Sequence, residues 1–231
     1  MKLRSTVIVV AAVAMAAMLQ TAHASMSLAA FEAGGTLTAG GLTFTGSGPF
    51  GGDESGLTGF NVNVDAYESG GIVYLSWGGN IALSSTGPSS ADLILQYTVR
   101  GGPVGMIDQT YTGSAQGGNL SVVETVATGG FGGTTVASST LNGIGDNSDP
   151  PENAFDVVGD DLYLVPPQSS LYVTKDINFG ITSLTGGLIT ISAVTQSFHA
   201  VPEPSTVIAG ALLVLPFGVS ALRILRRNRI G

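Results

Sequence analysis

Short runs in which apolar and polar residues alternate extend along most of the chain. The clearest is Phe60–Ala66, whose strict alternation is typical of a strand with one buried face. Further runs of this kind lie at Leu42–Thr45, Ile72–Trp77, Asp92–Val99, Leu120–Val126, Thr134–Leu141, Leu162–Val165, Leu171–Ile177 and Leu188–Phe198. Breaks rich in glycine or proline separate these runs, as at Gly101-Gly102-Pro103, Gly129-Gly130 and Gly186-Gly187.

The pattern predicts an all-β body of eight to eleven short strands. No stretch carries a 3.6-residue apolar stripe, and β-branched residues are abundant. Turn signals at this spacing favour an antiparallel β-sandwich of jelly-roll-like type. A solenoid is the alternative, but the sequence shows no fixed period. We expect one domain over residues 25–200.

The first 24 residues have the features of a secretory signal peptide. Lys2 and Arg4 precede the apolar stretch Val7–Leu19, and Ala22-His23-Ala24 is a small-residue cleavage site of the A-x-A kind. Cleavage after Ala24, with Ala22 and Ala24 as the recognised residues, would leave Ser25 at the mature N-terminus. An uncleaved N-terminal anchor is the alternative.

Residues 201–231 form three modules in a fixed order. Val201-Pro202-Glu203-Pro204-Ser205 is an extended rod, because proline fixes φ and disfavours helix in the residue before it. The 17 uncharged residues 206–222 follow, near the lower limit of the roughly 17–25 that span a bilayer as a helix. Four arginines end the chain and predict a cytoplasmic C-terminus: Arg223, Arg226, Arg227 and Arg229. A plain membrane anchor is the alternative.

This arrangement resembles the PEP-CTERM sorting signal of Gram-negative bacteria. The match consists of Val201 to Ser205 for the motif, 206–222 for the membrane helix and the arginines for the basic terminus. The resemblance implies a membrane-embedded exosortase as processing partner and an inner-membrane intermediate. It also implies delivery to the cell surface or an extracellular matrix, often one containing exopolysaccharide. It implies no activity for the body, because proteins of this class share only the tail.

The body is strongly acidic once the terminal segments are set aside. Six of the eight basic residues lie in those segments, so only Arg100 and Lys175 remain beside 15 of the 16 acidic residues, giving a formal charge of −13 for residues 25–200. Such a charge repels nucleic acid and suits uncharged polymers or cations. The chain has no cysteine and therefore no disulfide framework.

The sequence offers no catalytic constellation, and we expect no enzyme, no catalytic residue and no cofactor. His199 is the sole histidine outside the signal segment and stands next to the Pro-Glu-Pro rod, so serine and cysteine nucleophile systems lack their usual base. Gly46–Gly51 matches G-x-G-x-x-G without the strand-to-helix context that the motif needs. Glycoside hydrolysis by two carboxylates stays open as a less favoured alternative without a nominated pair.

One loop concentrates carboxylates between residues 143 and 161. Its six acidic residues are Asp146, Asp149, Glu152, Asp156, Asp160 and Asp161. Calcium prefers oxygen ligands of this kind, but the spacing does not match an EF-hand. A solvated acidic loop without a metal is the favoured interpretation.

Two functions remain for the body: a structural or matrix protein, which we favour, or a carbohydrate-binding module for exopolysaccharide. A module would use exposed aromatic residues, for which Trp77 with Tyr74 or Tyr67 is the candidate group. Strand alternation places Val73 and Trp77 on one face and Tyr74 on the other. The alternation therefore predicts that Trp77 lies in the core.

Overall fold

The computed structural model of the chain describes residues 23–48, 51–144, 154–157 and 161–201. The predicted signal peptide up to residue 22, residues 202–205 of the predicted sorting motif, the predicted membrane segment 206–222 and the four arginines lie outside these residues. Most of the acidic loop 143–161 does as well. Within the described part of the chain, no helix is long and apolar enough to cross a membrane.

The described residues form antiparallel strands with one short helix. The strands are β1 (Ala24–Ser27), β2 (Thr36–Ala39), β3 (Leu42–Gly46), β4 (Leu57–Thr58), β5 (Asn63–Ser69), β6 (Ile72–Ser85), β7 (Ser89–Gln116), β8 (Gly118–Thr128), β9 (Thr134–Ile144), β10 (Ala154–Val157), β11 (Asp161–Ile181) and β12 (Gly187–Ala200), and the helix is α2 (Leu28–Glu32). Ser27 caps this helix through its side chain, which accepts a hydrogen bond from the Ala30 amide at 3.3 Å.

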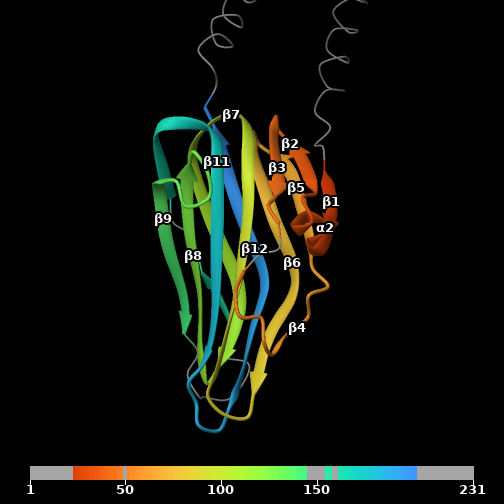
Figure 1. The fold of residues 1–231 in the computed structure, drawn as a ribbon, viewed down its shortest axis with the longest axis vertical. Coiled ribbons are helices and arrows are strands. Elements are labelled where there is room, and N and C mark those ends of the chain that lie inside the picture. The colour runs from red at the N-terminus through yellow and green to blue at the C-terminus, as the bar shows by residue number, and fades with distance from the viewer. Residues whose placement is uncertain (1–22, 49–50, 145–153, 158–160, 202–231) are drawn as a thin grey trace, which may run out of the picture.

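The strands stack as a sandwich of two layers (Figure 1). The β8 layer contains β2, β3, the first half of β7, the second half of β11, β8 and β9, in that order. The β6 layer contains β1, β5, β6, β12 and the second half of β7, with β10 and the start of β11 beyond it. The short strand β4 pairs with β6.

Two long strands belong to both layers, and therefore all strands share one hydrogen-bonded sheet. β7 pairs with β3 up to Arg100 and with β12 from Val104 onward, so it changes layer at Gly101-Gly102-Pro103. β11 changes layer between Tyr163 and Ser170, where its register against β7 shifts. The predicted break between two strands at Gly101-Gly102-Pro103 is wrong, because β7 bends there and continues to Gln116.

The core lies between the two layers. It is filled by the apolar side chains that point inward at every second position of the strands. Phe44 of β3 packs against Phe198 of β12 with ring centroids 5.0 Å apart, and Phe31 of α2 meets Trp77 edge-on at 5.8 Å. Tyr111 of β7 donates a hydrogen bond across the core to the carbonyl of Leu120 in β8. These contacts confirm an all-β sandwich with a single apolar core.

Most predicted runs coincide with strands, although their lengths differ. The run at Phe60–Ala66 begins three residues too early, because β5 starts at Asn63. The runs at Leu162–Val165 and Leu171–Ile177 are parts of the single strand β11. Five short elements matched no predicted run: β1, α2, β2, β4 and β10.

Both ends of the described chain lie at the same end of the sandwich (Figure 1). Val201 follows β12, and its amide donates a hydrogen bond to the Pro103 carbonyl at 2.8 Å, beside the bend of β7. β1 pairs with β5 from Ala24 onward. The first and last described residues, His23 and Val201, thus lie at one end of the sandwich.

Candidate binding site

A row of polar side chains lies on the outer face of the β8 layer. Leu93, Leu95 and Ile177 are buried in the core, so their neighbours along β7 and β11 face outward. The register places Asn178 opposite Asp92 and Thr174 opposite Gln96. Gln96 donates a hydrogen bond to the Thr174 hydroxyl at 3.3 Å. Carboxylate, amide and hydroxyl groups of two adjacent strands therefore lie on one surface, which Ile94, opposite Asp176, interrupts on the β7 side.

The segment after β3 adds a third side to this surface. Asp53 runs beside β7, donating its amide hydrogen to Asp92 Oδ1 at 2.7 Å, and its carbonyl accepts from the Asp92 amide at 3.0 Å. Gly52 permits this close approach: its φ is +122°, and a Cβ there would come within 2.6 Å of the Asp92 carbonyl oxygen. Asp53 is thus held against the end of β7 by main-chain and side-chain hydrogen bonds.

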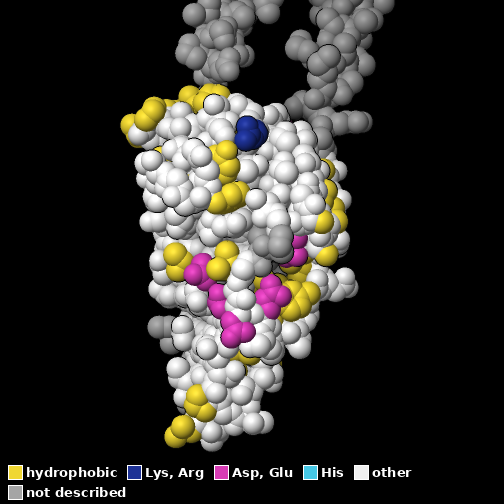
Figure 2. All heavy atoms as spheres, in the orientation of Figure 1, with side chains coloured by type: hydrophobic (Ala, Val, Ile, Leu, Met, Phe, Trp, Pro, Cys, Tyr) yellow, Lys and Arg dark blue, Asp and Glu magenta, His cyan; other side chains and the backbone are white. Residues whose placement is uncertain are grey.

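These residues surround a hollow of about 260 Å³ at the outer surface. It is lined by Asp53, Ser90, Ala91, Asp92, Asn119, Asn178, Phe179 and Gly180. Gly180 leaves space beside Asn119, because a Cβ at this glycine would lie 2.9 Å from Asn119 Oδ1. We call this feature the β7–β11 hollow. Figure 2 shows acidic side chains gathered about halfway down the face of the sandwich that is turned to the viewer.

The carboxylates at the hollow influence one another. Partial burial, followed by repulsion from Asp92, raises the pKa of Asp176, while the hydrogen bond that Asn178 donates to its Oδ1 at 2.9 Å opposes this shift. The pKa of Asp53 is lowered by hydrogen bonds from Ser55, whose amide donates to Oδ1 at 3.1 Å. The hollow therefore presents negatively charged hydrogen-bond acceptors, the carboxylates, beside hydrogen-bond donors, the side-chain amides.

Aromatic residues lie farther along the same outer face. Tyr172 of β11 stands opposite Thr98 in the register, six residues before Asn178 along β11. Phe131 meets Tyr172 edge-on with ring centroids 5.2 Å apart, and Arg100 Nη2 donates a hydrogen bond to the Tyr172 hydroxyl at 3.4 Å. The outer face of the β8 layer thus combines a polar hollow with an aromatic group toward the bend of β7.

The aromatic group predicted from the sequence does not form one surface. Trp77 is 4% exposed and packs in the core against Phe31 and Tyr97, as the alternation predicted. Tyr67 and Tyr74 stack on each other at 5.0 Å on the outer face of the β6 layer. Trp77 therefore cannot act as a stacking platform for a sugar.

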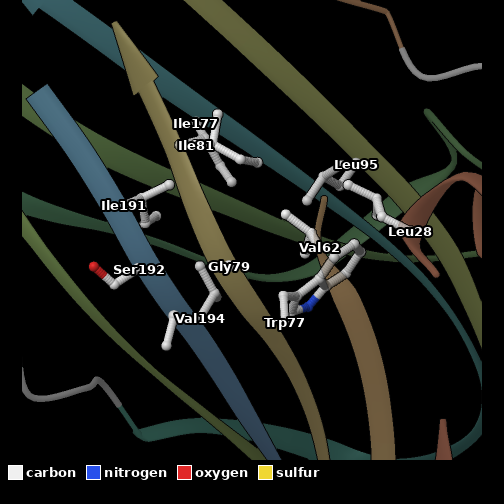
Figure 3. A pocket seen from close by; sticks show the side chains of 11 residues that line it. Leu28, Val62, Trp77, Gly79, Ile81, Leu95, Ile177, Ile191, Ser192 and Val194 are labelled. Atoms are coloured by element: carbon white, nitrogen blue, oxygen red, sulfur yellow. The ribbon is translucent and has the colours of Figure 1, made fainter. Parts of the chain in front are cut away.

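A small apolar gap of about 20 Å³ lies beside Trp77 (Figure 3). Val62, Ile81 and Ile191 line it, together with Gly79 of β6 and Ser192 of β12, where the register of β12 shifts. Trp77 Nε1 is buried in this region without a hydrogen-bond partner. The gap has about the volume that one water molecule needs, so it is too small to hold a sugar.

His199 lies on the outer face of the β6 layer, away from the hollow. Its Nε2 is 3.1 Å from the hydroxyl of Ser197, two residues earlier on β12, and Asp108 lies opposite Ser197 in the register. Burial raises the pKa of Asp108, Asp161 raises it further and His199 lowers it. The three side chains share a flat strand surface, and Ser197 is only 7% exposed.

A second polar group lies inside the core and was not singled out from the sequence. Lys175 and Glu124 pair at 2.6 Å with both side chains fully buried. Gln109 and Gln196 lie beside them. The alternation could have revealed this group, because Lys175 shares its strand face with Val173 and Ile177. By contrast, no sequence signal marks the hollow, whose residues occupy ordinary outward positions on separate strands.

No three His, Cys, Asp or Glu side chains gather closely enough to hold a metal ion within the described residues. Most of the acidic loop considered for calcium lies outside those residues, so that alternative is untested.

No protein-family model matches the chain, and no curated protein matches its sequence. Among solved structures, it is similar to a family 61 carbohydrate-binding module, TmCBM61, in complex with β-1,4-galactotriose, at 9% identity and TM-score 0.35 over 64% of this chain and 86% of that one. A family 4 carbohydrate-binding module gives 10% identity and TM-score 0.28 over 59% and 77%. An isomalto-dextranase of Arthrobacter globiformis T6 complexed with panose gives 12% and 0.32 over 77% and 32%. Similarity at these values supports no conclusion about function.

Proposed function

We propose that this protein is an exported surface or matrix protein whose β-sandwich binds an uncharged polysaccharide at the β7–β11 hollow. The single observation that carries the proposal is the hollow itself, where Asp53, Asp92, Asn119 and Asn178 converge on about 260 Å³ of open space. We further propose that the sandwich acts by binding and has no enzymatic activity. The jelly-roll-like subclass of sandwich is part of the same proposal.

The chemistry of the hollow suits sugar hydroxyl groups. A carboxylate accepts hydrogen bonds from hydroxyls through two oxygens, and an amide both donates and accepts. Hydrogen bonds to an ionised acceptor are stronger than those between neutral groups. A formal body charge of −13 repels polyanions at the same time. An uncharged chain rich in hydroxyls is the ligand that meets both conditions.

The shape of the outer face favours a polymer over a single sugar. Hydrogen-bonding side chains continue from Asp92 and Asn178 through Gln96 and Thr174 toward Tyr172. The six residues from Asn178 to Tyr172 extend about 20 Å along the strand. Side chains on neighbouring strands of a packed sheet keep a fixed spacing, which favours binding without rearrangement.

The C-terminal signal explains how such a domain would be displayed. We propose that exosortase recognises Val201-Pro202-Glu203-Pro204-Ser205 while the segment 206–222 and the arginines hold the chain in the inner membrane. The signal peptide 1–24 would start the export. Val201 lies at the bend of β7, whereas Asp92 lies eight residues before Arg100, about 27 Å away along the strand. A polymer could therefore reach the hollow while the tail is still anchored.

The alternative to polysaccharide binding is a matrix role without a ligand, and a binding experiment distinguishes the two. Affinity electrophoresis of the full-length protein in gels containing a neutral glucan, galactan or mannan should show retardation by at least one of them. Asp92→Asn and Asn178→Ala should each weaken the retardation by about tenfold, the effect of losing roughly one strong hydrogen bond. Ser76→Ala, on the outer face of the β6 layer, is the matched control and should behave as wild type. No retardation by any neutral polymer, or equal retardation of all variants, would contradict the proposal.

A further inference from the structure

Four polar side chains meet in the centre of the sandwich, where apolar residues are the rule. Lys175, Glu124 and Gln196 are 0% exposed, and Gln109 is 1% exposed. Lys175 Nζ lies 2.6 Å from Glu124 Oε2 and 2.7 Å from Gln109 Oε1. Lys175 is also the only lysine of the body. The only amine available on a body side chain is therefore enclosed with a carboxylate and a carboxamide.

The contact between Lys175 and Gln109 joins the two layers. Lys175 of β11 stands opposite Glu124 of β8 in the β8 layer. Gln109 of β7 stands opposite Gln196 of β12 in the β6 layer. The Nζ atom thus crosses the core to reach the amide of the other layer.

A buried ion pair alone gives little reason for this arrangement. Removing two charges from water costs several kcal/mol per ion, and apolar residues of similar volume are often equally or more stabilising. A reaction that converts the amine to an amide and neutralises the carboxylate would remove both charges. The neighbouring groups are those that such a reaction needs.

We propose that Lys175 and Gln109 form an intramolecular amide cross-link between the two layers, with Glu124 as the catalytic residue. Glu124 takes one proton from the Lys175 ammonium, which frees the nitrogen lone pair. Nζ then attacks Cδ of Gln109, the Nζ–Cδ bond forms and the Cδ–Nε2 bond breaks. Nε2 leaves as ammonia, taking one further proton from Nζ through Glu124. Glu124 keeps the first proton, so no buried charge remains and no oxidant or cofactor is needed.

The surrounding contacts position the reacting groups. Nζ at 2.7 Å from Gln109 Oε1 brings the adjacent Cδ within reach, since reacting atoms in productive complexes are about 3–3.5 Å apart. Gln109 Nε2 donates to Ser139 Oγ at 2.9 Å, which fixes the orientation of the carboxamide. Gln196 donates to Glu124 Oε1 at 2.5 Å and accepts a hydrogen bond from Tyr97. Each partner is therefore held by at least one further hydrogen bond.

Such a bond would supply what the composition lacks. The chain has no cysteine, so no disulfide bond can stabilise an exported domain of this kind. Lys175 and Gln109 are 66 residues apart, and closing a loop of this length covalently lowers the entropy of the unfolded chain. The cross-link would join the two layers at a point where no strand pairing connects them.

Trypsin digestion of the unfolded full-length protein tests the cross-link directly. Arg100 and Lys175 are the only arginine and lysine residues between Arg4 and Arg223, and trypsin does not cleave after an acylated lysine. We expect one peptide covering residues 101–223, lower in mass by one ammonia molecule. Separate, unmodified peptides 101–175 and 176–223 from the wild-type protein would overturn the proposal, and this readout depends on no variant.

Two variants identify the reacting groups. K175R keeps a positive charge and a trypsin site but has no nucleophilic amine, so it should yield both peptides without loss of ammonia. E124Q should also yield both peptides, because no base then frees the amine, and intact cross-linking in E124Q would refute the role of Glu124. Ring closure at Asn142-Gly143 would release ammonia too, but it leaves cleavage after Lys175 unaffected. Fragmentation that locates the new amide on Gln196 instead of Gln109 would overturn the assigned pair.

Discussion

Asp92 of β7 and Asp176 of β11 show how single residues on one face of the sheet create a site with its own electrostatics. Asp92 stands opposite Asn178, and Asp176 accepts a hydrogen bond from that asparagine at 2.9 Å. Burial and the neighbouring Asp92 together raise the pKa of Asp176. The folded protein therefore binds a proton at Asp176 more tightly than the unfolded chain does, and ionising this group lowers stability.

Asp176→Asn tests this electrostatic cost. An unfolded aspartate titrates near pH 3.9, and Asp176 titrates higher in the folded protein. The stabilisation that protonated Asp176 contributes is fully present below its pKa in the unfolded chain. It is lost as the pH rises from that value through the raised pKa of the folded state. The variant should unfold at a higher temperature than wild type at pH 7, and the difference should shrink toward pH 4. Glu68→Gln, which removes one charge from the other layer, is the control, and an equal pH-dependent gain in that control would contradict the explanation.

Predictions for single residues were correct where the alternation of apolar and polar positions alone decides whether a side chain is buried. The sequence predicted a buried Trp77, and the structure confirms it. Alternation also contained the signal for Lys175, at an inward position between Val173 and Ile177. The hollow could not be predicted, because Asp53, Asp92 and Asn178 come together only through strand pairing between distant segments.

At the scale of elements, β7 organises the sandwich by passing from one layer to the other. The bend at Gly101 depends on a backbone conformation that favours glycine, with φ at +133°. A Cβ at Gly101 would lie 2.2 Å from the carbonyl oxygen of Gly41. Glycine therefore allows β7 to pass the turn between β2 and β3 closely and to continue into the β6 layer.

Gly101→Ala should destabilise the fold by about 2 kcal/mol or more, from backbone strain and the clash with Gly41. Gly102→Ala is a matched control, because a Cβ there meets nothing within 4 Å, and its effect should stay within about 0.5 kcal/mol. Urea unfolding of the full-length variants measures both. Equal stability of the two variants would show that the bend does not require glycine at residue 101.

The strands themselves were largely predictable, and their connections were not. Period-2 alternation located most strands within a few residues, since each has one face in the core. Gly101-Gly102-Pro103 reads as a turn in sequence, because glycine and proline mark turns and bends alike. Only the pairing of β7 with both β3 and β12 distinguishes the two. The short strand β1 carries too few residues to show a period.

At the scale of the whole molecule, the proposed function assigns separate tasks to the acidic sandwich and to the terminal segments. The sandwich would carry the binding surface, and the segments would direct export and sorting. Val201 is held at the end of the sandwich beside the bend of β7, whereas the β7–β11 hollow lies toward the start of β7, at Ser90 to Asp92.

The double variant Pro202→Ala, Pro204→Ala tests the sorting proposal in cells that contain an exosortase. Removing both prolines allows the segment to leave its extended conformation, so processing and surface release should fall by at least about tenfold. Immunoblotting of membrane and extracellular fractions measures the change. Replacing the four arginines should instead impair membrane orientation. Unaltered processing of the proline variant would refute the sorting proposal.

Amide hydrogen exchange with and without a retained neutral polysaccharide tests the location of the binding site most directly. We predict that the polymer slows exchange in the segments that form the hollow and the adjoining row: residues 51–55, 89–98, 118–121 and 172–180. The outer strands of the β6 layer, including Tyr67 and Tyr74, should be unaffected. Protection centred on those tyrosines, or no protection anywhere in the sandwich, would contradict binding at the β7–β11 hollow.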